Sequence, residues 1–379
     1  MRERIAIVHP FPWPEVRRGA ERYLDDLSTY LVGAGHEVVI ITGTDGPSRK
    51  EQNPNGSSVS FRHHLRSGPM ARVGITKVET FGLQALAGLL RERADVVHAF
   101  TPSAAIAGRL ARRPTLYTVL GHPTSEQLPD AFLPRGLITR AVRMATVTAV
   151  LSRASAAALE SSLGVKAVVL PPGVRLGQFP PEFEPRTGPP RILFSASLDD
   201  RRKRADLAVA VLARVLDHHR DVRLLLSGQG DAGWVIDAAA RLGSTVASAV
   251  EVLGPGQTGD VPQRYRLATI TLLPSEHEAF GLVLLESLAS GTPVVCSPAG
   301  GMPEIVTDSV GCVAESARPE SLAEAVIKAI ALAALSQTPG RCVERSRRWA
   351  WETTVGPAHQ LLYADMANGG KGEIDIGPW

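Results

Sequence analysis

Short apolar segments alternate with segments of helical periodicity along almost the whole chain, and this alternation restricts the fold more than any other feature. In the first half, the apolar segments are residues 5–8, 38–41, 96–98, 116–119 and 146–151. A long helix is predicted over residues 20–32, because Leu24, Leu27 and Leu31 fall on one face. Strands separated by helices form right-handed βαβ units, so the pattern predicts an α/β fold with parallel sheets.

A proline-rich stretch after residue 170 interrupts the pattern, and a second series of strands follows it. That series comprises residues 192–195, 222–226, 250–253, 270–273 and 294–296. A chain of 379 residues is also longer than one core usually supports. We therefore expect two Rossmann-like domains with a cleft between them. The predicted boundaries are an N-terminal domain over 1–170, a linker over 171–190, a second domain over 191–345, a last helix within 346–366 and a flexible tail over 367–379.

Charge and cysteine content exclude several classes of protein. The net charge is +3, and no basic stripe interleaved with aromatic residues is present, so nucleic acid is not expected as a partner. The three cysteines, Cys296, Cys312 and Cys342, form no C-x-x-C pair, which favours a reducing compartment and a cytoplasmic protein. No apolar run approaches the ~18 residues of a membrane span.

The segment from Pro274 to Glu286 carries the sharpest chemical information. A strand is predicted to end at Pro274, and a helix to begin near Gly281. The backbone N–H groups of Phe280, Gly281 and Leu282 would then face outwards and form an anion site that suits a diphosphate. Glu286 would lie under ~10 Å from the helix start, at the distance of a ribose, and Glu278 would reach the sugar on the other side. The alternative is that both are ordinary acids favoured by the helix dipole.

The pair Glu278 and Glu286 resembles the Glu-x7-Glu motif of glycosyltransferase family 4, whose members are retaining enzymes of the GT-B fold. Further segments similar to that family, in the same order, are residues 18–21, 35–38, 95–98, 172–174, 291–295, 300–306 and 349–352. The resemblance implies transfer of a hexose-type sugar from a UDP- or GDP-linked donor to an acceptor hydroxyl, with retention. It also implies that the last helix crosses back to the first domain. No D-x-D occurs, which argues against transferases that hold the diphosphate through a metal. No cofactor is expected, since the nucleotide-sugar is a co-substrate.

The same resemblance assigns roles to individual residues. Lys203 would neutralise the donor diphosphate, although a solvated charge run is the alternative interpretation of residues 201–204. The family has an arginine six positions before this lysine, where this chain has Ser197, so Arg202 or Arg18 could compensate. Gly19 would let the backbone approach the donor phosphate, and His122 would lie near the transferred sugar. The expected catalytic residues are thus His122, Lys203 and Glu278, and the donor-binding set is Gly19, Arg202, Lys203, Gly228, Glu278, Phe280, Gly281, Leu282 and Glu286.

Rival functions remain open at this point. Gly228, Gly230 and Gly233 fit the G-x-G-x-x-G pattern of a dinucleotide-binding oxidoreductase, although glycosyltransferase family 4 also has a Gly-x-Gly here. An epimerase or another GT-B enzyme, and a catalytically weak binding protein, are further alternatives. The acceptor, whether a small molecule, a glycan or a lipid-linked compound, is expected to meet loops such as residues 47–72.

Three arginines, Arg135, Arg140 and Arg143, stand among apolar residues in the first domain. This pattern predicts a solvated basic face. A weak contact with a membrane surface is the alternative.

Overall fold

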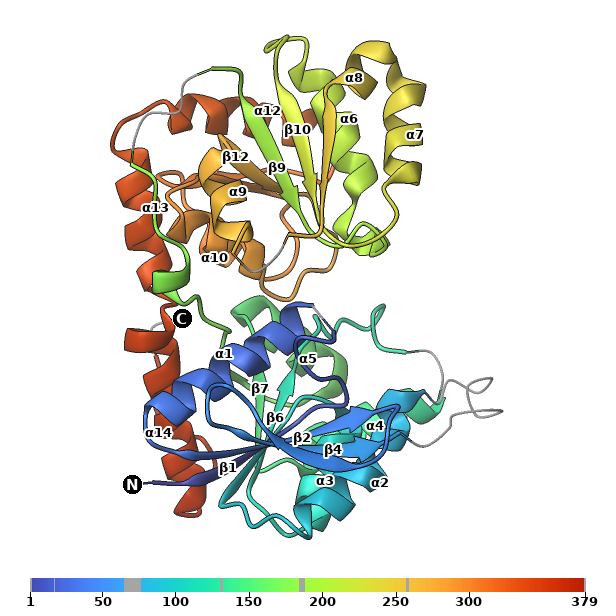
Figure 1. The fold of residues 1–379 in the computed structure, drawn as a ribbon, viewed down its shortest axis with the longest axis vertical. Helices are drawn as coiled ribbons and strands as arrows, with labels where there is room; N and C mark the ends of the chain where they lie inside the picture. The colour runs from blue at the N-terminus through green and yellow to red at the C-terminus, as the bar shows by residue number, and fades with distance from the viewer. Residues whose placement is uncertain are drawn as a thin grey trace. The chain divides into compact units, whose positions relative to one another are not determined.

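The computed structural model describes residues 2–16, 18–64, 76–129, 132–183, 188–256 and 259–377. They form two compact α/β units (Figure 1). Unit 1 comprises Met1–Gly173 together with Trp351–Trp379, and unit 2 comprises Val174–Ala350. The chain thus leaves unit 1 once and returns to it at Trp351.

Unit 1 is built on a sheet with the strand order β3-β4-β2-β1-β5-β6-β7-β8 among the described residues. The strands are β1 (Arg4–Val8), β2 (Glu37–Thr44), β3 (Arg49–Gln52), β4 (Ser58–His63), β5 (Val96–Ala99), β6 (Thr115–Val119), β7 (Val147–Val150) and β8 (Val168–Val169). All pairs are parallel except β3 with β4. The helices are α1 (Gly19–Gly33), α2 (Lys77–Leu89), α3 (Pro102–Leu110), α4 (Phe132–Met144), α5 (Arg153–Leu163) and α14 (Gly356–Ala367).

Local signals explain where several of these helices begin and end. Thr76 and Glu79 form a capping box at the start of α2. The hydroxyl of Ser152 accepts a hydrogen bond at the start of α5, and Gly164 ends that helix with a left-handed backbone at φ 65°. The central strand β1 is buried on both faces, since residues 5–8 are fully buried.

One part of the loop predicted over residues 47–72 is in fact a sheet edge. Residues 49–52 form β3, which pairs antiparallel with β4. Strand β3 has the sequence RKEQ, and it lacks the apolar alternation by which strands are recognised. Its backbone hydrogen bonds to β4 make it a strand. Residues 65–72 of the predicted loop lie outside the described part of the chain.

Unit 2 has an all-parallel sheet with the order β11-β10-β9-β12-β13-β14 among the described residues. The strands are β9 (Arg191–Ser195), β10 (Arg223–Ser227), β11 (Val250–Gly254), β12 (Ile270–Leu273), β13 (Val294–Cys296) and β14 (Gly311–Val313). The helices are α6 (Ala205–Val215), α7 (Gly233–Leu242), α8 (Ser244–Ser248), α9 (Val261–Leu267), α10 (Leu282–Ala289), α11 (Met302–Ile305), α12 (Pro319–Ala333) and α13 (Thr338–Arg347). Two parallel-sheet units confirm the predicted fold class.

Helix α14 is fixed to unit 1 by buried hydrogen bonds. The Tyr23 hydroxyl lies 2.8 Å from Nε2 of His359, and the Tyr363 hydroxyl lies 2.6 Å from Nδ1 of His98. Nδ1 of His359 donates to the carbonyl of Val355 at 2.7 Å, so its Nε2 is the acceptor for Tyr23. The C-terminal segment is therefore an integral part of the core of unit 1.

The Gly-rich end of the chain makes specific contacts up to residue 377. The Asp365 side chain accepts a hydrogen bond from the backbone of Gly372 at 2.9 Å, and Ile376 is buried.

Among the described residues, no single helix has both the length and the apolar character of a membrane span. By length and composition alone, the bent pair Pro319–Ala333 and Thr338–Arg347 would pass the same test.

Candidate functional site

The order of strands in unit 2 reverses between β9 and β12. The chain runs outwards from β9 to β10 and β11 on one side, and from β12 to β13 and β14 on the other. In an open parallel sheet, ligands bind beyond the carboxyl ends of the strands at such a switch point. The two loops that begin there are the one after β9, which contains Lys203, and the one after β12, which contains Glu278.

Lys203 and Glu278 meet between these two loops. The Lys203 ammonium donates a hydrogen bond to the Glu278 carboxylate, and the two side chains are 25% and 17% exposed. A second contact joins the loops, since the backbone N–H of Glu276 donates to the carbonyl of Arg202 at 2.8 Å. The structure therefore brings together the lysine and the first glutamate that the sequence singled out.

Helix α10 begins beside this pair with free amides. Within the described ranges, no acceptor is present for the backbone N–H groups of Phe280, Gly281 and Leu282. Gly281 has φ 105°, a left-handed conformation that strongly favours glycine. Free N–H groups at a helix start attract anions, and the Lys203 charge adds to this attraction.

Glu286 lies one turn further along α10 and is 5% exposed. The hydroxyl of Tyr265, a fully buried residue of α9, donates to Oε2 of Glu286 at 2.7 Å. The same hydroxyl lies 3.3 Å from Oγ of Ser195 at the end of β9. Tyr265 therefore orients the carboxylate expected to meet a ribose. Tyr265 could not be predicted as part of this site, because nothing in the sequence links residue 265 to residue 286.

The basic run over residues 201–204 resolves into separate contacts. Arg201 stacks 3.8 Å above the Trp234 ring centroid. Arg202 donates two hydrogen bonds to Asp200, at 3.0 and 2.7 Å, and the bond to this carboxylate raises the pKa of Arg202. Arg204 pairs with Asp206 and Glu276. Lys203 is the member of the run that meets Glu278.

The two candidates to replace the missing arginine are both engaged elsewhere. Ser197 itself lies 3.5 Å from the carbonyl of Gln229. Arg202 is held by Asp200, and its side chain is 64% exposed. Arg18, in unit 1, donates to both carboxylate oxygens of Glu21, at 2.6 and 3.3 Å.

The glycines after β10 allow two loops to approach each other closely. A Cβ at Gly228 would lie 1.8 Å from the carbonyl oxygen of Ala196, which is too close. At Gly230, φ is 112°, and a Cβ would lie 2.6 Å from the Asp199 side chain. Gly228 and Gly230 of the G-x-G-x-x-G pattern thus serve the packing of this loop against the start of the loop after β9.

Two of the expected site residues, Gly19 and His122, lie in unit 1. Gly19 is the first residue of α1, and His122 follows β6, with its Nδ1 3.1 Å from the Ser155 hydroxyl. Sequence analysis missed His9, which directly follows β1 and is 5% exposed. Its Nε2 lies 3.2 Å from Glu21, and Nδ1 has no partner within the described ranges. Burial acts to raise the pKa of Glu21, but hydrogen bonds from His9 and Arg18 hold this pKa below its usual value.

Helix α4 of unit 1 presents the three arginines along one face. Arg135, Arg140 and Arg143, with Gly136, Thr139 and Met144, line a cavity of about 690 Å³. None of the three guanidinium groups has a carboxylate partner in the part of the chain that the structure describes.

No group of three or more His, Cys, Asp or Glu side chains in the described residues is arranged to hold a metal ion. Lys203 and the free backbone N–H groups of residues 280–282 together form a candidate anion site in unit 2.

Comparison with known proteins points to glycosyltransferases. Residues 17–178 match the family model described as Glycosyltransferase Family 4, and residues 178–349 match the model described as Glycosyl transferases group 1. The chain is 29% identical to the D-inositol 3-phosphate glycosyltransferase of Actinosynnema mirum, over 89% of this chain and 90% of that protein. It is 27% identical to the glycogen synthase of Mycobacterium tuberculosis, over 93% and 92% of the two chains.

A solved structure with a similar fold is the sucrose-phosphate synthase of Thermosynechococcus elongatus. Its TM-score is 0.82 at 20% identity, and the match covers 97% of this chain and all of that one. Both family models are of glycosyltransferases, which favours a glycosyltransferase over the dinucleotide-binding alternative. The chain belongs to glycosyltransferase family 4 and has the GT-B fold of two Rossmann-like domains.

Proposed function

We propose that the chain transfers a hexose-type sugar from a UDP- or GDP-linked donor to an acceptor hydroxyl, with retention of configuration and without a metal ion. The observation that carries this proposal is the contact of Lys203 with Glu278 beside the free amides of residues 280–282. A cation and several N–H groups at one point match a diphosphate, which carries negative charge and many acceptor oxygens.

The donor would be held by three groups of unit 2. Its diphosphate would lie on the start of α10, with Lys203 beside it. Its ribose would meet Glu286, whose carboxylate is oriented by Tyr265 at 2.7 Å. Its sugar hydroxyls would meet Glu278. An ammonium has three N–H donors, so Lys203 can contact the phosphate and retain Glu278.

Catalysis would rest on stabilising the departing diphosphate. As the sugar–phosphate bond breaks, negative charge develops on the phosphate oxygens, next to Lys203 and the amides of α10. Retention would follow if the acceptor hydroxyl attacked the face from which the phosphate leaves. The departing phosphate oxygen would then take the acceptor's proton, and no metal would be needed. His122 of unit 1 is proposed to contact the transferred sugar.

The acceptor is proposed to be a polyhydroxylated compound bound mainly by unit 1. The name of one relative gives D-inositol 3-phosphate as its acceptor, and that of another gives glycogen as its product. A small phosphorylated polyol and a glycan chain are therefore the first acceptors to test, with lipid-linked sugars next.

A panel of nucleotide-sugars tests the proposed function. Purified protein would be incubated with UDP- and GDP-linked hexoses, each with inositol 3-phosphate or a maltooligosaccharide, with and without EDTA. We expect one donor to release nucleotide, and the rate of release to increase when the acceptor is present. EDTA should leave this rate unchanged. By NMR, the transferred sugar should have the same anomeric configuration in the product as in the donor. If none of the tested donors released nucleotide, the transferase assignment for this chain would be refuted.

The basic face of α4 and the cellular location extend this proposal. We propose that the enzyme works in the cytoplasm, in keeping with its three widely spaced cysteines, none of which belongs to a C-x-x-C pair. Arg135, Arg140 and Arg143 would supply a weak contact with anionic surfaces. Sedimentation with vesicles containing phosphatidylserine would measure this contact, and an equal affinity for neutral vesicles would refute it.

A further inference from the structure

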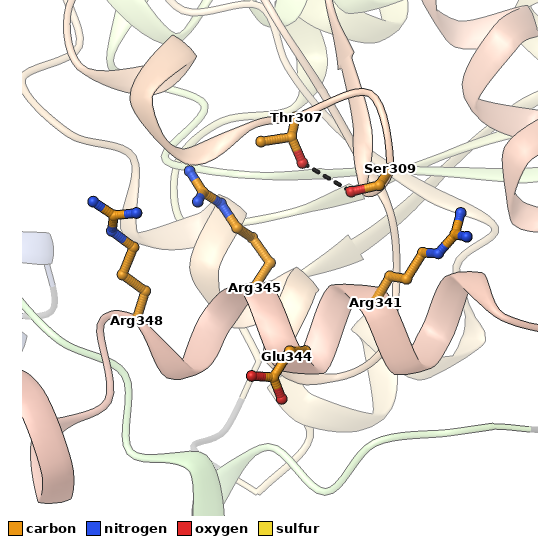
Figure 2. Close-up of a pocket in the computed structure, with 6 residues that line it drawn as sticks. All are labelled: Thr307, Ser309, Arg341, Glu344, Arg345 and Arg348. Carbon is orange, nitrogen blue, oxygen red and sulfur yellow. Dashed lines mark hydrogen bonds between the residues drawn. The ribbon is translucent and has the colours of Figure 1, made fainter. Parts of the chain in front are cut away.

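A basic pocket in unit 2 lies outside the donor loops. It has a volume of about 460 Å³ and is lined by Thr307, Ser309, Arg341, Glu344, Arg345 and Arg348 (Figure 2). The three arginines are at positions i, i+4 and i+7, so they share one face of α13 and its C-terminal cap. Thr307 and Ser309 come from the loop between α11 and β14.

The charge in this pocket is strongly positive. In Figure 2, the guanidinium groups of Arg345 and Arg348 extend from α13 towards the loop, while the Glu344 carboxylate points away from them. Glu344, which also lines the pocket, accepts a hydrogen bond at 2.8 Å from Arg347, which does not, so its charge is compensated. The hydroxyls of Thr307 and Ser309 lie 3.0 Å apart and add polar groups to the opposite wall.

Arg345 is the member of this cluster that reaches furthest into the protein. It donates to the carbonyls of Ile305 at 2.9 Å and Glu304 at 2.6 Å, and lies 4.8 Å above the Trp349 ring centroid. Burial and the charge of Arg348 lower the pKa of Arg345. An anion in the pocket would relieve that repulsion, and Arg345 retains N–H donors for it, since the two carbonyls use only part of its five.

The carbonyls held by Arg345 belong to α11, a single helical turn that also touches the donor loop. Just before α11, the N–H of Gly301 donates to the Glu278 carbonyl at 3.0 Å. Packing is tight at this point, because a Cβ at Gly300 would lie 1.8 Å from the Glu278 carbonyl oxygen. A Cβ at Gly281 would lie 3.2 Å from Cγ of Met302, in α11. One end of this turn therefore contacts Glu278 and Gly281, and the other is fixed by Arg345.

We propose that this pocket is a second anion site, which binds a phosphate monoester or inorganic phosphate and changes donor affinity through α11. In Figure 2, Arg345 lies between Arg341 and Arg348, whose guanidinium groups point apart. Guanidinium groups and two hydroxyls spaced along one pocket suit a phosphate group, whose oxygens can accept from several donors. The volume is in the range of small-molecule sites. Binding would draw Arg345 and Arg348 towards the ligand and so shift α11, which bears on the residues beside the proposed diphosphate site.

The first experiment measures binding to the full chain by calorimetry, with inorganic phosphate and glucose 6-phosphate as separate probes. The test variant is Arg341→Gln/Arg348→Gln, which leaves the Arg345 contacts with α11 intact. The control is Lys328→Gln, because Lys328 is an exposed basic residue of the neighbouring helix α12 and does not line the pocket. We expect affinity for the tighter probe to fall about tenfold or more in the double variant and to be unchanged in the control.

Phosphate could also occupy the donor site, so each titration is repeated with Lys203→Ala. Binding that survives Lys203→Ala and is lost in the double variant supports the pocket. Binding that is lost with Lys203→Ala, is unaffected in the double variant, or is absent in the wild-type protein would overturn the proposal. None of these outcomes depends on whether the chain is a transferase.

The second experiment tests coupling to the donor site. UDP and GDP affinities are measured with and without saturating probe, and probe affinity with and without nucleotide. Because coupling is reciprocal, the factor by which the probe changes nucleotide affinity must equal the factor by which the nucleotide changes probe affinity. We expect this coupling factor to be about fivefold or more for the nucleotide that binds. The factor should become one in the double variant. A factor of one in the wild-type protein would refute the coupling.

Discussion

Lys203 and Glu278, which follow two adjacent strands of unit 2, are joined by a hydrogen bond across 75 positions of sequence. The contact keeps a cation at the switch point of the sheet and gives it a fixed orientation. Because Lys203 is only 25% exposed, little water competes for its charge. A diphosphate at the start of α10 would find this charge already in place, which is the condition for efficient electrostatic catalysis.

Replacing Lys203 with methionine should reduce kcat for sugar transfer by about 10²–10³-fold, because the leaving diphosphate loses its nearest cation. Methionine preserves the apolar stem, so folding should change little. Initial rates of nucleotide release over a range of donor concentrations would measure the effect. Arg202→Met is the informative comparison, since Asp200 already holds Arg202. We expect Arg202→Met to reduce kcat by less than about fivefold. An equal loss in both variants would show that Arg202 replaces the missing arginine after all.

Tyr265→Phe should weaken donor binding although Tyr265 is not expected to touch the donor. The variant removes the 2.7 Å hydrogen bond to Glu286, a buried carboxylate. We expect KM for the donor, and Kd for the free nucleotide, to rise about three- to tenfold while kcat changes less. This change corresponds to about 0.7–1.4 kcal/mol, within the net contribution of about 0.5–1.5 kcal/mol that one hydrogen bond makes.

The control for this prediction is Tyr30→Phe, which loses a 2.7 Å bond to Gln360 in unit 1. It should alter stability without altering nucleotide affinity. Unchanged nucleotide affinity in Tyr265→Phe would refute the role of Tyr265 in orienting Glu286.

Several features of this fold and site could be predicted from the sequence, because each depends on residues that are close together along the chain. The strand predicted over residues 5–8 corresponds to β1 (Arg4–Val8), and the helix start near Gly281 to α10 (Leu282–Ala289). Apolar periodicity and glycine position suffice for such local features.

What could not be predicted are pairings between distant residues. Arg202 is bound by Asp200, and Glu286 by Tyr265. Both contacts depend on how loops and helices pack. The polar strand β3 likewise exists because β4 is beside it. His9 could not be singled out from the sequence either, because it is distinguished from other loop histidines only by its contact with Glu21 at 3.2 Å. Tertiary packing decides these contacts, and a single sequence does not display it.

Gly228→Ala should destabilise unit 2 and impair donor binding. A Cβ there would lie 1.8 Å from the Ala196 carbonyl oxygen, so the loops after β9 and β10 would have to separate. We expect a loss of about 2–4 kcal/mol in the free energy of unfolding. Gly340→Ala is the matched control, because a Cβ at this position in α13 meets nothing within 4 Å. It should be neutral or should stabilise by up to about 1 kcal/mol. Urea unfolding of both variants would measure the difference, and similar midpoints would contradict the close approach.

The attachment of α14 to unit 1 should weaken in mild acid. Burial lowers the pKa of His359 to about 4 from its ordinary 6.5, and burial, with a contribution from His359, lowers that of His98 well below the same value. Both side chains are therefore neutral in the folded state. The groups around them, Tyr23 and Tyr363, have pKa values raised by burial and remain protonated throughout this range.

The sign of the effect follows from proton uptake. Between pH 6.5 and about 4, the unfolded chain binds protons at these histidines that the folded chain does not, so stability falls as pH falls. By pH 4 and below, His359 alone is expected to lower the free energy of unfolding by up to about 3 kcal/mol. Hydrogen exchange of the α14 backbone, followed by mass spectrometry from pH 7 to 4 and corrected for the intrinsic rate, should show protection declining through this window. In His359→Gln the decline should be shallower, even if the variant starts from lower protection. The control His218→Gln alters an exposed residue of unit 2 and should leave the decline unchanged. Protection of α14 that stays constant down to pH 4 would show that these histidines do not control the attachment of the last helix.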